Sequence, residues 1–157
     1  MSDADLELVD LARSRIGARL GGKYRIDELV GIGGMAAVYV ATAPNGAQFA
    51  VKMLHPTLSV RAEMRKRFVL EGHAANSVKH PGFVPVLDDD GAEDGNAFLV
   101  MELLVGQSVE ELWQGHGGRL PPEVALAIGR ELCDVLVGDG PVTVAIDEIA
   151  VTTSKRL

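Results

Sequence analysis

The chain has 157 residues, which suits one domain or one lobe of a larger fold, and 47% of them are hydrophobic. Its net charge of −7 argues against the basic surface that nucleic acids and anionic membranes require. The single cysteine, Cys133, excludes an internal disulfide framework and is typical of a reducing compartment. No stretch approaches the roughly 20 apolar residues that span a bilayer, and residues 1–21 do not resemble a signal peptide. We therefore expect a cytoplasmic protein without a membrane segment or a nucleic-acid partner.

The first part of the chain predicts a helix followed by a meander of three strands. Residues 4–16 have helical spacing of apolar residues, and the "GARLGGK" that follows is typical of a flexible joint. Apolar and polar residues then alternate from Tyr24, and two further strands are predicted at "AAVYVAT" and "FAVKML". A hairpin turn at Asn45-Gly46 joins the last two strands, and the glycine-rich "GIGG" joins the first two.

The later part of the chain predicts three helices and two strands. Ser59 is a candidate cap for a long helix over 60–79, and the strands "VPVLD" and "AFLVMELL" follow it. Ser108 is a candidate cap for a short helix, "VEELW", and residues 120–137 predict a second long helix. The apolar residues of that last helix need a cover from the tail or from another chain, or else stay exposed. We interpret Cys133 as a small core residue among them.

The glycine-rich loop has several possible explanations. A tight turn alone would explain clustered glycines. A dinucleotide fingerprint needs a helix directly after the glycines, whereas "VYVAT" follows here, and a Walker loop needs a Gly-Lys-Ser/Thr triplet that the chain lacks. The remaining design is a glycine loop at the tip of a β-hairpin, with its backbone N–H groups close to phosphates.

A lysine and a glutamate in apolar surroundings predict an ion pair. Lys52 lies within the apolar "FAVKML", where a buried ammonium needs an anion, although an edge-strand lysine could reach solvent. The stripe of the following helix runs through Met64, Phe68, Glu71, Ala75 and Val78. A carboxylate at the centre of a buried stripe needs a buried cation, so we expect Glu71 to pair with Lys52. The alternative is a helix rotated to bury Leu70, Ala74 and Val78, with Glu71 exposed.

Together these segments resemble the N-terminal lobe of a eukaryotic-type Ser/Thr protein kinase, of the bacterial receptor type. "VGIGGMAAVYVA" is similar to the nucleotide loop, "FAVK" to the family's V-A-I-K strand, and "FLVMELLVGQSVEEL" to the fifth strand, hinge and following helix. The resemblance covers residues 24–137. It implies an α+β fold: a five-stranded antiparallel sheet with a long αC-type helix, a hinge and one or two helices from the start of the C-lobe.

The resemblance also implies ATP as the ligand and assigns its contacts. Lys52 and Glu71 become the phosphate-positioning pair, and the backbones of Glu102 and Leu104 face the adenine edge. The implied binding residues are Val30, Gly31, Gly33, Gly34, Ala36, Val38, Ala50, Lys52, Met101, Glu102 and Leu104. Ala36 stands where the third glycine of the family's loop usually lies.

The chemistry of phosphate transfer is missing from these 157 residues. Neither H-R-D-x-x-x-x-N nor D-F-G occurs, so the family's base and its Mg²⁺ ligands are absent. Asp139, Asp147 and Glu148 are better explained as solvated residues than as substitutes. We therefore expect a truncated or degenerate kinase domain with a partial ATP site and no metal site of its own. The alternatives are a non-catalytic interaction module regulating a signalling kinase, and the front half of a kinase completed by another polypeptide.

The expected organisation has four parts. Residues 1–22 form a helical extension and linker, and residues 23–104 form the kinase-like N-lobe. Residues 105–137 leave the hinge and begin the C-lobe, and residues 138–157 form a tail outside the family pattern. We expect a protein partner or self-association through the exposed last helix.

Overall fold

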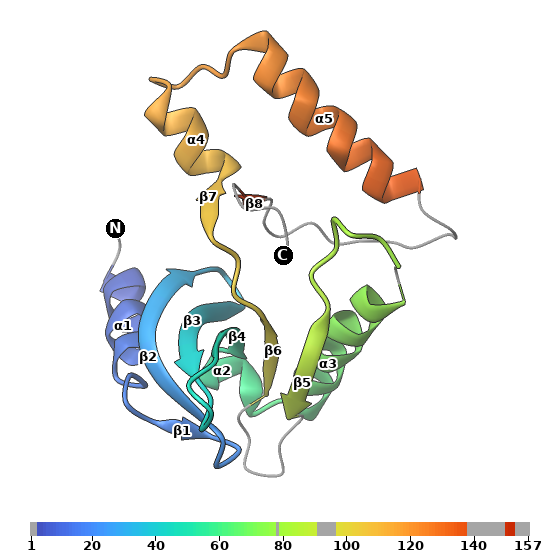
Figure 1. Cartoon of the computed structure of the whole chain (residues 1–157). Coiled ribbons are helices and arrows are strands. Elements are labelled where there is room, and N and C mark those ends of the chain that lie inside the picture. Colours follow the sequence, from blue (N-terminus) through green and yellow to red (C-terminus); the bar gives the residue numbers. More distant parts are fainter. Residues whose placement is uncertain (1–2, 78, 91–96, 138–149, 153–157) are drawn as a thin grey trace. The chain divides into compact units, whose positions relative to one another are not determined.

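The computed structural model describes residues 3–77, 79–90, 97–137 and 150–152, and the chain divides into two compact units (Figure 1). The first unit comprises residues 1–76 and 85–103, and the second comprises residues 77–84 and 104–157. The boundary at 103/104 falls inside the segment that the sequence predicts as a hinge.

A six-stranded antiparallel sheet forms the centre of the first unit, in the order β1-β2-β3-β4-β6-β5. The strands are β1 (Arg19–Leu20), β2 (Tyr24–Ile32), β3 (Ala36–Thr42), β4 (Gln48–Leu54), β5 (Val86–Asp90) and β6 (Phe98–Glu102). The five predicted strands are confirmed, but the count is one short because part of the expected joint forms β1. Leu20 pairs with Tyr24, and the turn between them uses φ values of 52° at Gly21 and 68° at Gly22, which favour glycine.

The sheet curls far enough for side chains from β2 and β5 to meet. The Tyr24 hydroxyl donates a hydrogen bond to Asp88 Oδ2 at 2.8 Å, and Lys23 Nζ lies 3.3 Å from the same oxygen. The Tyr24 ring also packs edge-on against Phe49, with ring centroids 5.8 Å apart. The hydrogen bond from Tyr24, more than the charge of Lys23, holds the pKa of Asp88 below its ordinary value.

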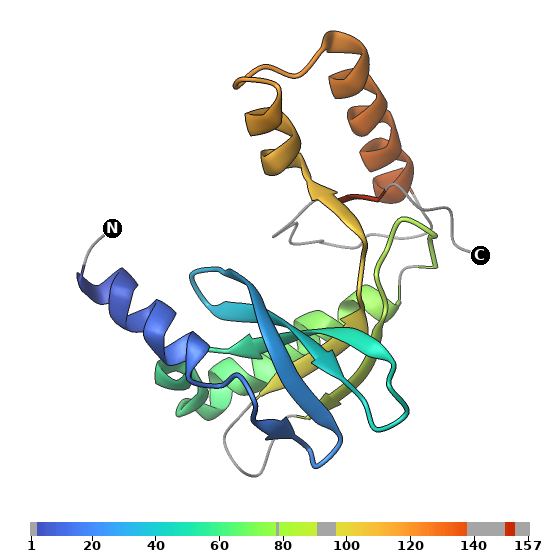
Figure 2. The same cartoon turned by 60° about the vertical axis from the view of Figure 1, so that its left-hand side comes forward.

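Helices α1 (Asp3–Arg13) and α3 (Ala62–Asn76) cover opposite faces of the sheet (Figure 2). Ala12 of α1 packs in one core with Tyr39 and Val51, and the Tyr39 hydroxyl donates to the Ala12 carbonyl at 3.0 Å. Phe68 of α3 packs in a second core with Leu99 on the other face. Full burial of a side chain such as Val51, Phe68 or Leu99 stabilises a fold by about 1.5–3 kcal/mol. The N-terminal helix thus packs against the sheet of the first unit.

The predicted helix over 60–79 is wrong at its start. A separate turn, α2 (Pro56–Ser59), comes first, and α3 begins at Ala62. His55 is the N-cap of α2 with extended backbone, and Pro56 occupies its first turn, where the fixed φ of proline suits a helix start. Ser59, the predicted cap of the long helix, instead ends α2 with its side chain buried.

Among the described residues of α3, Phe68 and Gly72 are buried and Met64 and Val69 pack beside them against the second core, whereas Glu71 is exposed. A Cβ atom on Gly72 would lie only 2.6 Å from Leu99 Cδ1, so the helix backbone approaches β6 closely at this point. This approach turns the neighbouring Glu71 toward solvent. The expected burial of Glu71 is therefore wrong, and its exposure agrees with the alternative. The buried stripe of that alternative is wrong at Leu70, which is 55% exposed, and at Ala74, while Val78 lies outside the described residues.

The second unit contains β7 (Gly106–Ser108), α4 (Val109–Gly115), α5 (Pro122–Val137) and β8 (Ala150–Thr152). Both predicted helices are confirmed. The Ser108 hydroxyl accepts the Glu111 N–H at 3.1 Å, and the Ser108 N–H donates to the Glu111 carboxylate at 2.7 Å, which closes a capping box. β7 pairs with β8, where Gly106 lies opposite Thr152. Nε2 of His80 lies 3.2 Å from the Asp134 carboxylate on α5.

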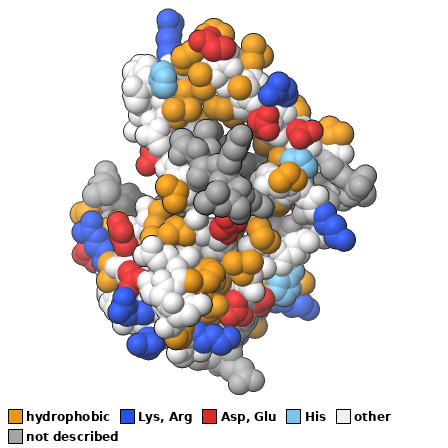
Figure 3. Space-filling model, viewed as in Figure 1, with side chains coloured by type: hydrophobic (Ala, Val, Ile, Leu, Met, Phe, Trp, Pro, Cys, Tyr) orange, Lys and Arg blue, Asp and Glu red, His pale blue; other side chains and the backbone are white. Residues whose placement is uncertain are grey.

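Helix α5 has no buried residue among those described, and hydrophobic side chains gather on its surface (Figure 3). Leu126 is 74% exposed and Val137 is 83% exposed. Cys133 is also exposed, so its interpretation as a core residue is wrong. Most of the tail, which is one of the alternative covers for this helix, lies outside the described residues. Within the described part of the chain, no helix has the length and apolar character needed to cross a membrane.

Candidate nucleotide site

The glycine loop lies at the tip of the β2–β3 hairpin, as the sequence predicts. Gly33, Gly34 and Met35 connect the strands, and the Gly33 N–H donates to the Ala36 carbonyl at 2.8 Å to close the turn. Among the described residues, no backbone or side-chain acceptor takes the N–H of Gly34 or Met35. A strand and not a helix follows the glycines, which is inconsistent with the dinucleotide fingerprint.

The three glycines of this loop do not serve the turn. Gly31, Gly33 and Gly34 are absent from the positions with positive φ, in contrast to Gly46 in the next hairpin at 83°. A Cβ atom on Gly31 or Gly34 would meet nothing within 4 Å, and one on Gly33 would make only an ordinary contact at 3.6 Å. Neither backbone strain nor internal packing therefore requires glycine in this loop. The missing side chains leave the backbone open to approach from outside.

Strand register brings the predicted pocket residues to one face of the sheet. Val38 pairs with Lys52, and one pleat further along the same two strands Val40 pairs with Ala50. Ala50 in turn pairs with Met101 of β6. Because residues two apart on a strand point to the same side, Val38, Ala50, Lys52 and Met101 share a face. Lys52 is half-buried on it.

Glu71 lies on the outer face of α3 and bonds to its own helix. Its Oε1 atom accepts a hydrogen bond from Arg67 Nε at 2.7 Å, one turn earlier, and the two side chains are 43% and 72% exposed. This bond raises the pKa of the Arg67 guanidinium further. The structure thus places the carboxylate away from the buried position that the sequence argument gave it, and the pairing of Glu71 with Lys52 stays a prediction.

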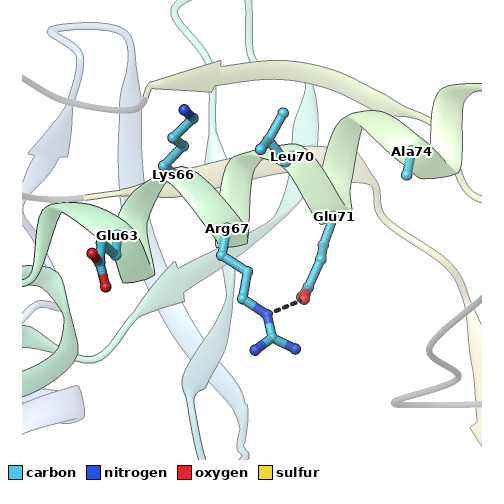
Figure 4. Close-up of a pocket in the computed structure, with 6 residues that line it drawn as sticks. All are labelled: Glu63, Lys66, Arg67, Leu70, Glu71 and Ala74. Atoms are coloured by element: carbon cyan, nitrogen blue, oxygen red, sulfur yellow. Dashed lines mark hydrogen bonds and ion pairs between the residues drawn. The ribbon is translucent and has the colours of Figure 1, made fainter.

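An open groove of about 370 Å³ follows this outer face (Figure 4). It is lined by Glu63, Lys66, Arg67, Leu70, Glu71 and Ala74. All six residues belong to α3, and none comes from the glycine loop, from β4 or from the hinge. The groove is therefore a feature of the helix surface and is separate from the candidate nucleotide site.

The remaining predicted contacts lie at the end of β6. Glu102 is the last residue of this strand, where it pairs with Phe49, and Leu104 is the first residue of the second unit. Both are half-buried. Val30 is 59% exposed beside an irregularity in the register of β2 against β3. Asp139, Asp147 and Glu148 lie outside the described residues, and the rest holds no cluster of three His, Cys, Asp or Glu side chains suited to a metal.

Sequence reasoning missed two residues that organise this region. Gly72 carries no side chain, so a pattern of apolar residues passes over it, although it decides which face of α3 is buried. His55 follows the lysine strand and is only 3% exposed. Its place at the end of an apolar run, directly before a proline, is the one sequence signal that could have marked it.

Comparisons with known proteins find relatives of this chain among protein kinases. No protein-family profile matches the chain. The chain is 34% identical over 118 residues to the serine/threonine-protein kinase pkn2 of Myxococcus xanthus, a match that covers 74% of this chain and 14% of that protein. It is 34% identical over 122 residues to PrkC of Bacillus subtilis, covering 77% of this chain and 18% of that protein. The homologues of this chain are bacterial serine/threonine protein kinases.

Solved kinase structures give the same result for the fold. The kinase domain of Mycobacterium tuberculosis PknI superposes with a TM-score of 0.63 at 26% identity. The match covers 77% of this chain and 48% of the PknI chain. The curled antiparallel sheet with its helices thus has the fold of a protein-kinase N-lobe. The chain spans about half of that kinase domain and less than a third of the curated relatives it matches.

Proposed function

We propose that the first unit is a nucleotide-binding lobe whose glycine loop holds the phosphates of ATP. The observation that carries this proposal is the geometry of Gly31, Gly33 and Gly34, which have ordinary φ values and no packing that demands glycine. Their bare backbone is therefore available to a ligand. Backbone N–H groups in such a loop are well suited to phosphate oxygens, and those of Gly34 and Met35 have no acceptor among the described residues.

The face that carries Lys52 supplies the rest of the site in this proposal. The lysine ammonium meets the α- and β-phosphates, while Val30 and Val38 cover the purine ring from above. Ala50 and Met101, one pleat further along, line the adenine pocket. Ala36 closes the loop, and the backbones of Glu102 and Leu104 bond the adenine edge. These roles are those of the homologous kinases, transferred position by position.

We also propose that Glu71 exchanges Arg67 for Lys52 when nucleotide is bound. The Arg67–Glu71 pair is exposed and joins residues one turn apart, and solvent screens such pairs so that they contribute little to stability. Arg67 is therefore a weak competitor of the half-buried Lys52 ammonium for this carboxylate. The exchange requires α3 to roll away from the contact between Gly72 and Leu99.

This proposal does not extend to phosphate transfer by the 157 residues alone. The family's catalytic aspartate deprotonates the acceptor hydroxyl, and loss of such a base lowers a rate by about 10²–10⁴-fold. Mg²⁺ would neutralise charge on the phosphates, but the motifs that ligate it in the family are missing from the sequence. The cytoplasmic location expected from the composition also remains part of this proposal.

A second candidate function is a non-catalytic interaction module, favoured by the apolar side chains of α5 that are exposed in the part of the chain that the structure describes. Leu126 and Val137 are among the most exposed hydrophobic side chains of the described chain. Sedimentation at increasing concentration tests self-association through this surface. The association should weaken in Leu126→Glu, and a chain that stays monomeric at every concentration would leave only a different protein as the partner.

Titration with a fluorescent ATP analogue tests the nucleotide proposal. Lys52→Met removes the proposed phosphate contact, and Lys66→Met makes the same change on the exposed face of α3 as a matched control. A charged hydrogen bond contributes about 1.5–3 kcal/mol, so Lys52→Met should weaken binding about tenfold or more. Lys66→Met should bind like the wild type. Absence of saturable binding to the wild type, or equal affinities for all three proteins, would overturn the proposal.

A further inference from the structure

His55 connects the lysine strand to both ends of the glycine turn. It follows β4 directly, and its imidazole is buried, with 3% of the residue exposed. Nε2 of its ring lies 2.7 Å from the Gly33 carbonyl oxygen. Its backbone N–H donates to the Met35 carbonyl at 2.9 Å. One residue therefore holds the carbonyl groups on either side of Gly34.

The chemistry of these contacts determines where the proton lies. A carbonyl oxygen only accepts hydrogen bonds, so Nε2 of His55 carries a proton and donates it to the bond. Both the neutral ring protonated at Nε2 and the imidazolium satisfy this requirement. The contact does not depend on a charge on the histidine, and it differs in this respect from the proposed ion pairs of the site.

The other side of His55 is anchored in the helical part of the lobe. Its carbonyl accepts the N–H groups of Leu58 and Ser59, each at 2.9 Å, and so begins α2. Arg65 of α3 in turn donates to the Ser59 carbonyl. Through His55, the glycine loop is therefore bonded to the start of α2, which is itself bonded to α3.

The direction of the Gly33 carbonyl also determines the direction of the Gly34 N–H group. In a trans peptide the C=O of one residue and the N–H of the next lie in one plane and point in opposite directions. The Gly33 carbonyl points to the His55 ring, so the N–H of Gly34 points away from it. This is one of the two loop N–H groups without an acceptor among the described residues.

We propose that His55 is a positioning residue that fixes the Gly33–Gly34 peptide and so aims the Gly34 N–H at a bound phosphate. The inference rests on the proposed nucleotide function for its ligand, but the restraint on the loop exists without one. Without the His55 donor, the Gly33–Gly34 peptide is free to flip, because two adjacent glycines place no steric limit on it.

Three substitutions separate the hydrogen bond from the volume of the side chain. His55→Phe keeps a ring and removes the donor. His55→Gln places an amide donor at nearly the reach of Nε2, whereas His55→Asn carries its donor too close to the backbone. His73→Phe is the matched control, because His73 lies on the same lobe with its ring 50% exposed against Asp89.

Amide hydrogen exchange without nucleotide is the first measurement. In His55→Phe and His55→Asn the N–H group of Gly33, which closes the turn on the Ala36 carbonyl, should exchange about tenfold faster than in the wild type, as expected for loss of one hydrogen bond. His55→Gln should restore most of the protection, and His73→Phe should not change it. Wild-type exchange in His55→Phe and His55→Asn would overturn the inference. If His55→Phe fails to fold, the contrast between Gln and Asn decides.

Affinity for a fluorescent ATP analogue is the second measurement. His55→Phe and His55→Asn should bind about tenfold more weakly, with His55→Gln close to the wild type. If the wild type binds no analogue, the proposed nucleotide function fails, while the exchange data still judge the restraint by His55. If exchange accelerates in His55→Phe but affinity is unchanged, the aiming of the Gly34 N–H is refuted and the nucleotide function is not.

Discussion

Replacement of Gly72 by alanine tests the packing that positions α3. A Cβ atom at this position would lie 2.6 Å from Leu99 Cδ1 and 2.8 Å from Cδ2. Leu99 is only 4% exposed and belongs to the second core, so its side chain has little room to yield. The new methyl group must therefore displace either the helix or β6.

Two opposing contributions determine how much Gly72→Ala changes the free energy of unfolding. Alanine stabilises a helix interior relative to glycine by about 1 kcal/mol. Insertion of a methyl group into a packed core costs about 1–3 kcal/mol. We expect Gly72→Ala to lower the free energy of unfolding by about 1 kcal/mol. Gly129→Ala in α5 is the matched control, because a Cβ atom there meets nothing within 4 Å and only the favourable term remains.

Urea denaturation, followed by far-ultraviolet circular dichroism, measures the free energy of unfolding of both variants. The double variant Gly72→Ala/Leu99→Ala should be more stable than Leu99→Ala alone, because the smaller side chain at position 99 makes room for the new methyl group. A Gly72→Ala protein more stable than the wild type would show that Gly72 does not pack against Leu99 as described. It would mean that α3 is rolled so that Gly72 leaves Leu99, and the neighbouring Glu71 would then be free to turn inward.

Three further substitutions test other contacts of the fold. Tyr39→Phe removes the buried hydrogen bond to α1, and we expect a loss of about 0.5–1.5 kcal/mol in urea denaturation, whereas no loss would mean that α1 is not docked. Ser108→Ala removes the cap of α4 and should cost about 1 kcal/mol, read as faster amide exchange in the first turn of that helix; unchanged exchange there would contradict the capping box. Tyr24→Phe removes the main cause of the lowered pKa of Asp88. A carboxyl group whose pKa is lowered in the folded state contributes stability above its unfolded pKa of about 3.9, and this contribution is lost as the pH falls through the folded-state pKa. The wild type should therefore be more stable than Tyr24→Phe at pH 6, and the two stabilities should converge toward pH 3. A stability difference that does not change with pH would contradict this.

The parts of the fold that follow local rules could be predicted from the sequence. The hairpin turn at Asn45-Gly46, the alternation in β3 and β4, and the cap at Ser108 each depend on residues a few positions apart. The register of these strands then brings Val38 and Lys52 opposite one another without further information. The strand predicted directly after the glycines likewise places the glycine loop at the tip of a hairpin.

The parts that failed depend on contacts distant in the sequence. The burial of α3 is decided by Gly72 against Leu99, 27 positions later, and a glycine leaves no trace in an apolar pattern. β1 is too short to show an alternation and forms only because Tyr24 lies opposite Leu20. Cys133 was assigned to a core that the described part of α5 does not have. The orientation of Glu71 was an inference from that same apolar pattern.

Binding of ATP by the glycine loop can be tested in the nuclear magnetic resonance spectrum of the ¹⁵N-labelled chain, titrated with ATP. We expect saturable shifts of the amide signals of Gly31, Gly34 and Met35 in the glycine loop, of Lys52 and of the residues at the end of β6. The same titration with Lys52→Met should need a much higher ATP concentration. Signals of the glycine loop and of β4 that do not move at saturating ATP, with or without shifts elsewhere, would contradict the account.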